Sequence, residues 1–267
     1  MGFLYISFLA LIQGITEFLP VSSSGHLVLI SQILNKPEHN LHLDVSVHFG
    51  TLLAVILFYR KDVLLLASGF SENVRFNFSH KNALFFRLLI IATIPVIILG
   101  LIFKLTGFVD SLRSIKIVGL GMLIFSIFLY LSDKYGKKDR IKSEWSYRDA
   151  IFMGLWQSVA LIPGTSRSGN TITGALILGF SRESSTNLSM IMSIPTILAS
   201  SVLLSLDLTR IDSTNLNLSS VALAVFLSFI AALLSLSLLI RFIRTHNFTP
   251  FIIYRVSLGI ILLYLTY

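Results

Sequence analysis

The segment Gln13-Gly-Ile-Thr-Glu17-Phe-Leu-Pro20-Val-Ser-Ser-Ser-Gly25-His26 interrupts the apolar sequence near the beginning of the chain. The apolar residues on its two sides, 3–19 and 26–34, are each fewer than the roughly 20 that a helix needs to cross a bilayer. Pro20 disfavours helical backbone at the residue before it. Irregular backbone is tolerated at membrane depth only where it is buried in protein or lines a wet cavity. The segment therefore predicts a re-entrant helix–loop–helix hairpin, which enters and leaves the membrane on the same side.

A second broken segment lies in the other half of the chain. Its loop, Pro163-Gly-Thr-Ser-Arg-Ser-Gly169, resembles residues 20–25, and it follows Gln157 at nearly the spacing at which Pro20 follows Gln13. Each half also has a later apolar helix with a central proline, at Pro95 or Pro195. We expect an inverted-topology repeat with halves of about 1–132 and 145–267, and a binding site where the two broken segments meet. The alternative is a chance similarity between two apolar stretches.

The composition is that of a membrane protein. The 267 residues are 54% hydrophobic and 13% charged, whereas a soluble domain has about 25% charged residues. The absence of cysteine excludes disulfides, thiolate metal sites and cysteine nucleophiles. The net charge of +8 comes from loops between apolar runs, without a basic stripe and stacking aromatics, so we expect no nucleic-acid partner. The whole chain, 1–267, is predicted to be one integral membrane domain.

Besides the two hairpins, six stretches approach the length and hydropathy of a membrane span. They are residues 43–59, 84–103, 115–132, 186–206, 219–240 and 249–267. The predicted fold is thus an all-α polytopic membrane protein with about six transmembrane helices and two re-entrant hairpins. The small residues Gly119 and Gly121 indicate close helix packing only, which leaves a homodimer open.

The charge distribution orients this topology. The loops 60–87, 133–149, 181–185 and 241–249 fall on one side and hold 14 of the 21 Lys and Arg residues. The other side holds five: Lys36, Lys104, Arg113, Lys116 and Arg210. The positive-inside rule places the basic side in the cytoplasm. The first hairpin then enters from outside and the second from inside, so we expect the active site to open toward the outer face.

The first hairpin offers an acid and a candidate nucleophile. Gln13 and Glu17 lie four residues apart and share a helical face. A carboxylate inside a membrane protein is costly and indicates function, although Glu17 could serve only to pair with Arg167. One of Ser22, Ser23 and Ser24 is expected to cap the following helix. A serine beside Glu17 and His26 also has the components of an activated nucleophile, with the histidine as base or acid.

The second hairpin has the composition of a phosphate cradle. Free N–H groups at a helix start favour an anion, and Arg167 is suited to bidentate phosphate contact. Ser166, Ser168 and Thr171 add donors, and Gly169 allows close approach to the backbone. The alternative is a capped helix whose arginine serves Glu17 alone.

Asp44 and His48 also share a helical face. One interpretation is functional: the two residues support the site or bind an ion or a proton. The other is structural: they form a polar pair that seals a helix interface.

These segments together resemble the two signature motifs of the bacterial undecaprenyl pyrophosphate phosphatase family, the membrane type that is linked to bacitracin resistance. The resemblance extends to Leu43-Asp-Val-Ser-Val-His48-Phe-Gly-Thr and to Ser193-Ile-Pro195, and so covers nearly the whole chain. It implies hydrolysis of a C55 polyprenyl pyrophosphate to the monophosphate in the bacterial plasma membrane, which recycles the lipid carrier of cell-wall synthesis. It also implies a divalent cation, Mg²⁺ or Ca²⁺, held at Gln13 and Glu17. The family has either Glu or Gln at the position of Gln13, so this chain offers one carboxylate fewer than some members.

Both lines of reasoning give the same hypothesis. Arg167 and the hydroxyl groups of the second hairpin, with Ser22, bind the phosphates, while Glu17 activates the nucleophile or positions the metal. Ser23 or His26 attacks the terminal phosphorus, or water attacks directly; the sequence leaves these three open. Rival functions are a lipid-phosphate transporter or flippase that uses the same repeat, an anion channel and a membrane scaffold.

Overall fold

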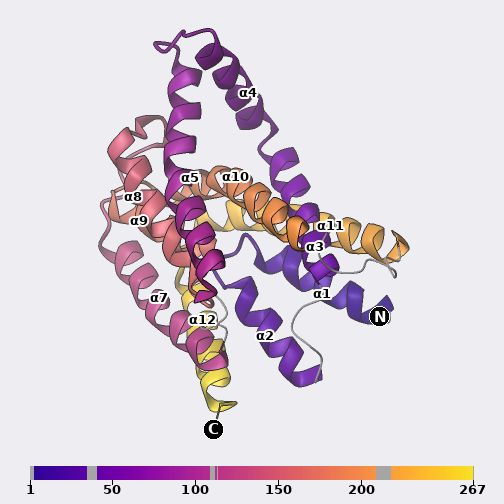
Figure 1. Cartoon of the computed structure of the whole chain (residues 1–267). Helices are drawn as coiled ribbons and strands as arrows, with labels where there is room; N and C mark the ends of the chain where they lie inside the picture. The colour runs from indigo at the N-terminus through magenta and orange to yellow at the C-terminus, as the bar shows by residue number, and fades with distance from the viewer. Residues whose placement is uncertain (1–2, 35–40, 109–111, 113, 209–217, 267) are drawn as a thin grey trace.

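The computed structural model describes residues 3–34, 41–108, 112, 114–208 and 218–266. Within these ranges every regular element is helical, apart from one isolated bridge between Arg140 and Phe180. The eleven α-helices of the described residues (Figure 1) are α1 (Phe3–Thr16), α2 (Ser23–Leu34), α3 (Leu41–Phe58), α4 (Arg60–Val74), α5 (Lys81–Thr106), α7 (Ile115–Tyr135), α8 (Tyr147–Ser158), α9 (Arg167–Ile177), α10 (Arg182–Leu208), α11 (Leu218–Ile243) and α12 (Thr249–Tyr264). Two single-turn 3₁₀ helices, η1 (Lys142–Glu144) and η2 (Val159–Leu161), flank α8. The all-α prediction is confirmed.

Four helices are long and apolar enough to cross a membrane: α5, α7, α10 and α11. They coincide with four of the six predicted spans. The other two predicted spans form apolar helices that are shorter, α3 with 18 residues and α12 with 16, against the roughly 20 that a full crossing needs. The chain is therefore a multi-pass membrane protein. Lys36, Arg113 and Arg210, which the charge argument assigned to the outer side, lie outside the described residues.

Helix α4 was not expected, because its charged sequence was interpreted as part of a polar connection. It continues the hydrogen-bond ladder of α3 through Tyr59, whose N–H donates to Val55 O at 2.9 Å and whose carbonyl accepts from Val63 N at 3.0 Å. Figure 1 shows α4 and the first turns of α5 projecting together beyond the other helices. Gly69 allows this pairing, since a Cβ there would lie 2.1 Å from Asn82 O of α5.

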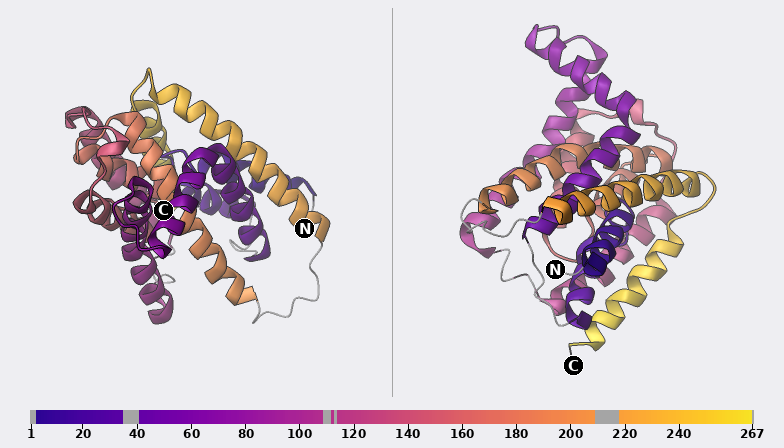
Figure 2. Two further views of the ribbon diagram at one scale, coloured as in Figure 1. Left: turned by 90° about the horizontal axis from the view of Figure 1, so that it is seen from above. Right: turned by 90° about the vertical axis from the view of Figure 1, so that its right-hand side faces the viewer.

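Many large apolar side chains are exposed on the helices, and small residues lie at some of the closest helix contacts, the pattern expected where lipid replaces water. On α11 the exposed stripe has Phe226, Ile230, Leu234 and Leu238 at intervals of four. The buried face of α11 includes alanine and serine residues in its first half, and α1 and α3 pack closely there through Gly14 and Gly50. The two views of Figure 2 show α11 running across these helices.

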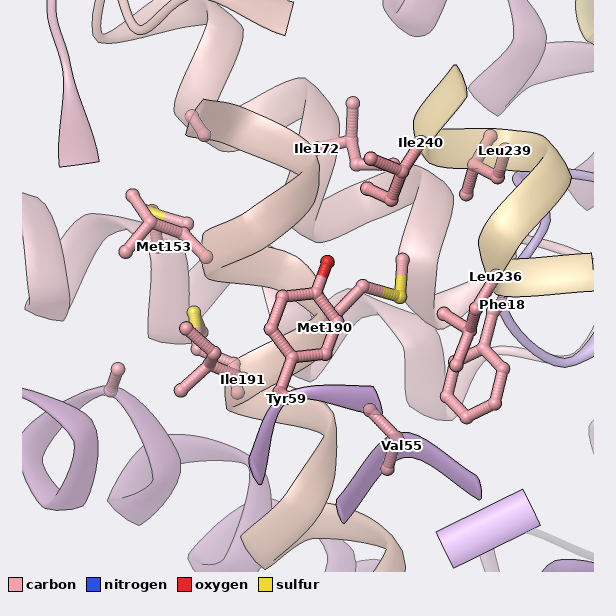
Figure 3. Packing of buried hydrophobic residues seen from close by; sticks show 14 of the residues in the cluster. Phe18, Val55, Tyr59, Met153, Ile172, Met190, Ile191, Leu236, Leu239 and Ile240 are labelled. Atoms are coloured by element: carbon pink, nitrogen blue, oxygen red, sulfur yellow. The ribbon is translucent and has the colours of Figure 1, made fainter. Parts of the chain in front are cut away.

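The largest core cluster lies where α3, α8, α9, α10 and α11 meet. Figure 3 shows Met190 and Ile191 of α10 among side chains from the other four helices, with Phe18 beside Leu236. Phe18 is fully buried and directly follows Glu17, so packing of the core fixes the turn that carries the predicted acid.

Within the described residues, three ion pairs join different loops that are predicted to face the cytoplasm: Arg182 with Asp133, Lys142 with Asp62, and Arg244 with Glu183. A fourth pair, Arg140 with Asp149, lies within the loop 133–149.

Candidate active site

The first broken segment turns between α1 and α2 in residues 17–22. Helix α1 ends at Thr16, three residues before the predicted end at Leu19, although Glu17 N still donates to Gln13 O at 2.9 Å. Ser22 has a left-handed backbone, with φ of 70°, and α2 begins at the next residue. This tight turn brings Ser23 back toward the end of α1.

In the second broken segment, the non-helical loop 162–166 connects η2 to α9. Gly164 has φ of 88° and lies so close to α7 that a Cβ would be 2.1 Å from Val118 O, so the conformation requires glycine. Ser166, with φ of 69°, caps α9 by accepting from Gly169 N at 3.1 Å. The helix start that the sequence predicted for this segment is present, and it has the cap that the alternative interpretation expected.

The two broken segments meet, and three hydrogen bonds join them. Arg167 Nη2 donates to Glu17 Oε1 at 2.7 Å. Ser168 Oγ donates to Leu19 O at 2.9 Å, and Gly164 N donates to Ser24 Oγ at 3.2 Å. The ion pair is largely buried, with exposed side-chain fractions of 16% for Arg167 and 8% for Glu17. Residues about 150 positions apart in the sequence thus form one constellation.

The second oxygen of the Glu17 carboxylate collects two further donors. Gln13 Nε2 donates to Oε2 at 2.7 Å, and Ser23 Oγ donates to the same atom at 3.1 Å. A hydroxyl group whose proton points at a carboxylate is arranged for deprotonation. Ser23 therefore has the environment of an activated nucleophile.

His48 completes this side of the site. Its Nδ1 lies 2.7 Å from Asp44 O, and because a carbonyl only accepts, Nδ1 carries the proton. The other nitrogen, Nε2, lies 3.3 Å from Gln13 Nε2 and accepts from it. Of the interpretations of His48 above, support for the site matches this geometry.

A cavity of about 230 Å³ lies between the two broken segments. Its polar lining includes Glu17, Ser23 and Arg167, and its remaining wall comes from α3, α5, α8, η2 and α10. The residues that follow the two helix prolines, Val96 and Thr196, both line it. The full lining is Glu17, Ser22, Ser23, Ser24, His48, Val96, Gln157, Ala160, Leu161, Ser166, Arg167, Thr196, Ile197 and Ser200.

The predicted phosphate-binding residues divide into two groups. Ser22, Ser166 and Arg167 line the cavity. Ser168 and Thr171 are buried behind it: Ser168 bonds to the first segment, and Thr171 donates to Arg167 O at 2.9 Å and contacts the hydroxyl of Ser189. Gly169 is buried at the first turn of α9. This second group holds the loop in shape.

His26 does not line the cavity. Its ring stacks on Tyr254 of α12, with centroids 5.5 Å apart, and its Nε2 lies 2.6 Å from the Tyr254 hydroxyl. Its Nδ1 donates to Ser22 O at 2.8 Å. His26 therefore steadies the serine loop from behind, and its predicted role in proton transfer or attack stays a prediction.

Sequence reasoning assigned no role to Arg255, which the structure buries completely against the second loop. Its Nη2 donates to Thr165 O at 2.9 Å. The signal for it was present, since a single arginine in an otherwise apolar helix indicates a specific partner. Gln157 was quoted only for its place in the repeat, yet it lines the cavity.

The residues fit the divalent cation that the resemblance implies. Among the described residues no cluster of three or more His, Asp or Glu side chains could hold a metal by itself. Mg²⁺, however, is commonly bound by one or two carboxylates together with substrate phosphates, and Glu17 supplies one carboxylate to the cavity. The buried Oε1 of Gln13 has no hydrogen-bond partner in the described part of the chain. Gln13 does not line the cavity and its Nε2 faces the carboxylate, so the amide would have to turn over to bring this oxygen beside Glu17.

Comparison with known proteins gives a consistent result. A family model described as "Bacitracin resistance protein BacA" matches residues 6–261. A protein of Jannaschia sp. (strain CCS1) named undecaprenyl-diphosphatase is 49% identical over 259 residues, 97% of either chain. Proteins of the same name are 47% identical over 267 residues, the whole of both chains, in Dinoroseobacter shibae, and 39% identical over 257 residues, 96% of this chain and 95% of the relative, in Aliivibrio salmonicida. With a family model and relatives that span nearly its full length, this chain belongs to the BacA family.

Proposed function

We propose that this protein hydrolyses undecaprenyl diphosphate to undecaprenyl phosphate and inorganic phosphate. The observation that carries the proposal is the Glu17 carboxylate, which binds Arg167 through one oxygen and the hydroxyl of Ser23 through the other. The cavity therefore holds both the guanidinium group of Arg167, which can bind an anion, and the hydroxyl of Ser23, which can act as a nucleophile. Relatives of the chain over its full length bear the name undecaprenyl-diphosphatase. The charged and hydroxyl-bearing residues of the cavity match a diphosphate head group, and the apolar residues that line the rest of it match the beginning of a lipid tail.

The first chemical step is attack by Ser23 Oγ on the terminal phosphorus. Its proton passes to Glu17 Oε2, 3.1 Å away. The bond from phosphorus to the bridging oxygen breaks, and undecaprenyl phosphate leaves. Arg167, Ser166 and the N-terminus of α9 stabilise the charge on the transferring group, because phosphoryl transfer is catalysed mainly by positioning and electrostatics. Ser23 is preferred to His26 because the histidine ring is engaged by Ser22 and Tyr254 outside the cavity.

In the second step water attacks the phosphoserine. The bond from phosphorus to Ser23 Oγ breaks, and the proton on Glu17 returns to this oxygen. The oxygen and both hydrogen atoms of the water leave as part of the inorganic phosphate. Glu17 thus acts as base and then as acid, and each cycle restores the starting state.

We further propose that Glu17, together with Gln13 once its amide has turned to present Oε1, would hold a divalent cation, Mg²⁺ or Ca²⁺, when substrate is present. Such an ion neutralises charge on the phosphate oxygens. The loss of one carboxylate relative to family members with Glu at position 13 predicts weaker metal affinity here, since fewer anionic ligands bind a hard cation.

The membrane placement follows from the same proposal. The halves 1–132 and 145–267 form inverted repeats, each contributing one re-entrant hairpin, in the bacterial plasma membrane, with the cavity open to the outer face. Packing supports this pairing, since α1 packs on α11 of the other half and α8 packs on α5. Pro95 and Pro195 do not occupy equivalent places in chain order, because α10 directly follows its hairpin whereas α3 and α4 precede α5.

The test is phosphate release from C55 diphosphate by the purified protein in detergent micelles, with and without a chelator. We expect release that the chelator abolishes. An obligate transporter would release none, because micelles have no second side. Rapid quench with labelled substrate should trap a phosphoserine at position 23, and Ser23→Ala should form none. A wild-type rate from Ser23→Ala would contradict the serine mechanism.

A further inference from the structure

Gln157 combines complete burial with an unused hydrogen-bonding group. It lies in the last turn of α8, is 0% exposed, and contributes to the wall of the cavity. Both its Oε1 and its Nε2 lack a hydrogen-bond partner within the part of the chain that the structure describes. Buried side-chain amides are nearly always hydrogen-bonded, so this one requires an explanation.

The other polar groups on this wall are already engaged. Thr196 Oγ1 donates to Met192 O at 2.9 Å, and Ser200 Oγ donates to Ile197 O at 3.0 Å, so both hydroxyl protons remain within α10. The rest of the wall near Gln157, including Leu161, is apolar. Among the described residues that line the cavity, Gln157 has the only side-chain amide. The N–H groups of this amide have no acceptor in the described part of the chain.

The corresponding glutamine of the first half is used differently. Gln13 Nε2 donates to Glu17 Oε2 at 2.7 Å and so orients the acid. Gln157 has no such partner, since the residue four positions later in its own half is Leu161. The two glutamines, at matching places in the two halves, thus have different roles. Gln13 orients Glu17, whereas the amide of Gln157 is free to bind a ligand.

The chemistry of the missing partner follows from the surroundings. An amide buried without a partner destabilises the fold, and the penalty is relieved when a bound group completes its hydrogen bonds. Arg167 makes this an anion-binding cavity, and hydrogen bonds to an ionised acceptor are shorter and stronger than neutral ones. A phosphate oxygen is thus the acceptor best matched to the free N–H groups.

We propose that Gln157 is a substrate-binding residue whose Nε2 donates to a non-bridging oxygen of the bound diphosphate. The inference rests on the proposed function, because that function places a diphosphate in this cavity. The amide supplies a directional contact without adding a second full charge to that of Arg167. It also faces the head group from the helix that precedes η2, whereas Ser23 and Glu17 come from the first half.

The experiment compares Gln157→Met with the wild type. Methionine is unbranched and of similar length, so it removes the hydrogen bonds with little change of shape. We expect kcat/KM for C55 diphosphate to fall about 10- to 100-fold, mostly through KM, as when a hydrogen bond to a charged group is lost. The thermal midpoint should stay equal or rise, because an unsatisfied buried amide has gone. A rise in KM without loss of stability is an outcome that a purely structural role would not produce.

Ser201→Ala is the matched control. Ser201 is a buried residue whose hydroxyl has no partner among the described residues, but it does not line the cavity. We expect unchanged KM and an equal or higher thermal midpoint. If Gln157→Met does not fold, Gln157→Glu keeps the shape, replaces the donor by an oxygen and should raise KM at least as much.

A second measurement separates this inference from the proposed function. Inorganic pyrophosphate, added alone, should raise the thermal midpoint of the wild type and raise that of Gln157→Met much less. If the wild type releases no phosphate from C55 diphosphate yet shows this difference, the proposed function fails and the anion contact stands. An unchanged KM together with an unchanged pyrophosphate shift in Gln157→Met would overturn the inference.

Discussion

Replacing Glu17 by glutamine should abolish turnover and destabilise the protein for one shared reason. The wild-type carboxylate accepts from Arg167 at one oxygen and from Gln13 and Ser23 at the other. A glutamine amide has one oxygen and one NH₂ group, so in either orientation a donor faces a donor. The substitution also leaves Arg167 largely buried without its counter-ion, a change that typically costs about 3–5 kcal/mol.

A double-mutant cycle separates the catalytic part of this effect from the structural part. We expect Glu17→Gln and Arg167→Met each to lower phosphate release at least about 100-fold, as for other charge-stabilising groups. Each should lower the thermal midpoint. The double variant buries neither charge, so it should recover part of the lost stability through a coupling free energy of at least about 1 kcal/mol, while its activity stays lost. Near-normal phosphate release by either single variant, or strictly additive destabilisation in the double variant, would refute the reasoning.

Three further predictions test the surroundings of the site. In Gly169→Ala the new Cβ would lie 2.9 Å from Arg255 Nη1, so the guanidinium group that holds Thr165 O must shift; kcat/KM should fall about 10-fold or more while the protein stays folded, as phosphate-release assays and thermal scans will check. Gly164→Ala combines φ of 88° with a Cβ 2.1 Å from a carbonyl oxygen of α7, and we expect too little folded protein for purification, measured by size-exclusion chromatography in detergent. Burial by itself would raise the pKa of Asp149, but hydrogen bonds from Arg140 and the capping serine hold that pKa below its ordinary value. The stability from Asp149 is therefore present above about pH 4 and lost as the pH falls through the lowered folded-state pKa, so Asp149→Asn should flatten the acid limb of a plot of thermal midpoint against pH.

The sequence predicted the elements of this fold that depend on composition and on local breaks. Pro20 and Pro163 lie in the two interruptions, and four of the six predicted apolar runs became the four longest apolar helices. It also identified Glu17 and Arg167 and allowed for their pairing, because a buried charge in an apolar chain needs a partner.

What it could not predict depends on helix rotation and on packing between distant segments. His26 follows the serine loop closely, yet its side chain lies against α12, which is remote in sequence. The sequence left His48 open between a residue of the site and a structural polar residue, and α3 brings it beside Gln13. Helix α4 has too many charges to be recognised by hydropathy, and its helical state comes from continuing α3 and from packing on α5.

The two halves of the chain contribute unequally to the chemistry, and this follows from their loop sequences. The first loop has a carboxylate before its proline and three serines after it, so it supplies the base and the nucleophile. The second has Leu161 where the acid would be and Arg167 in place of a serine, so it supplies the anion-binding groups. Each half alone would bury an uncompensated charge, Glu17 or Arg167, whereas together the two charges neutralise each other at 2.7 Å. The site of the proposed repeat therefore lies at the contact between the halves, because neither loop could keep its charged residue buried without the other.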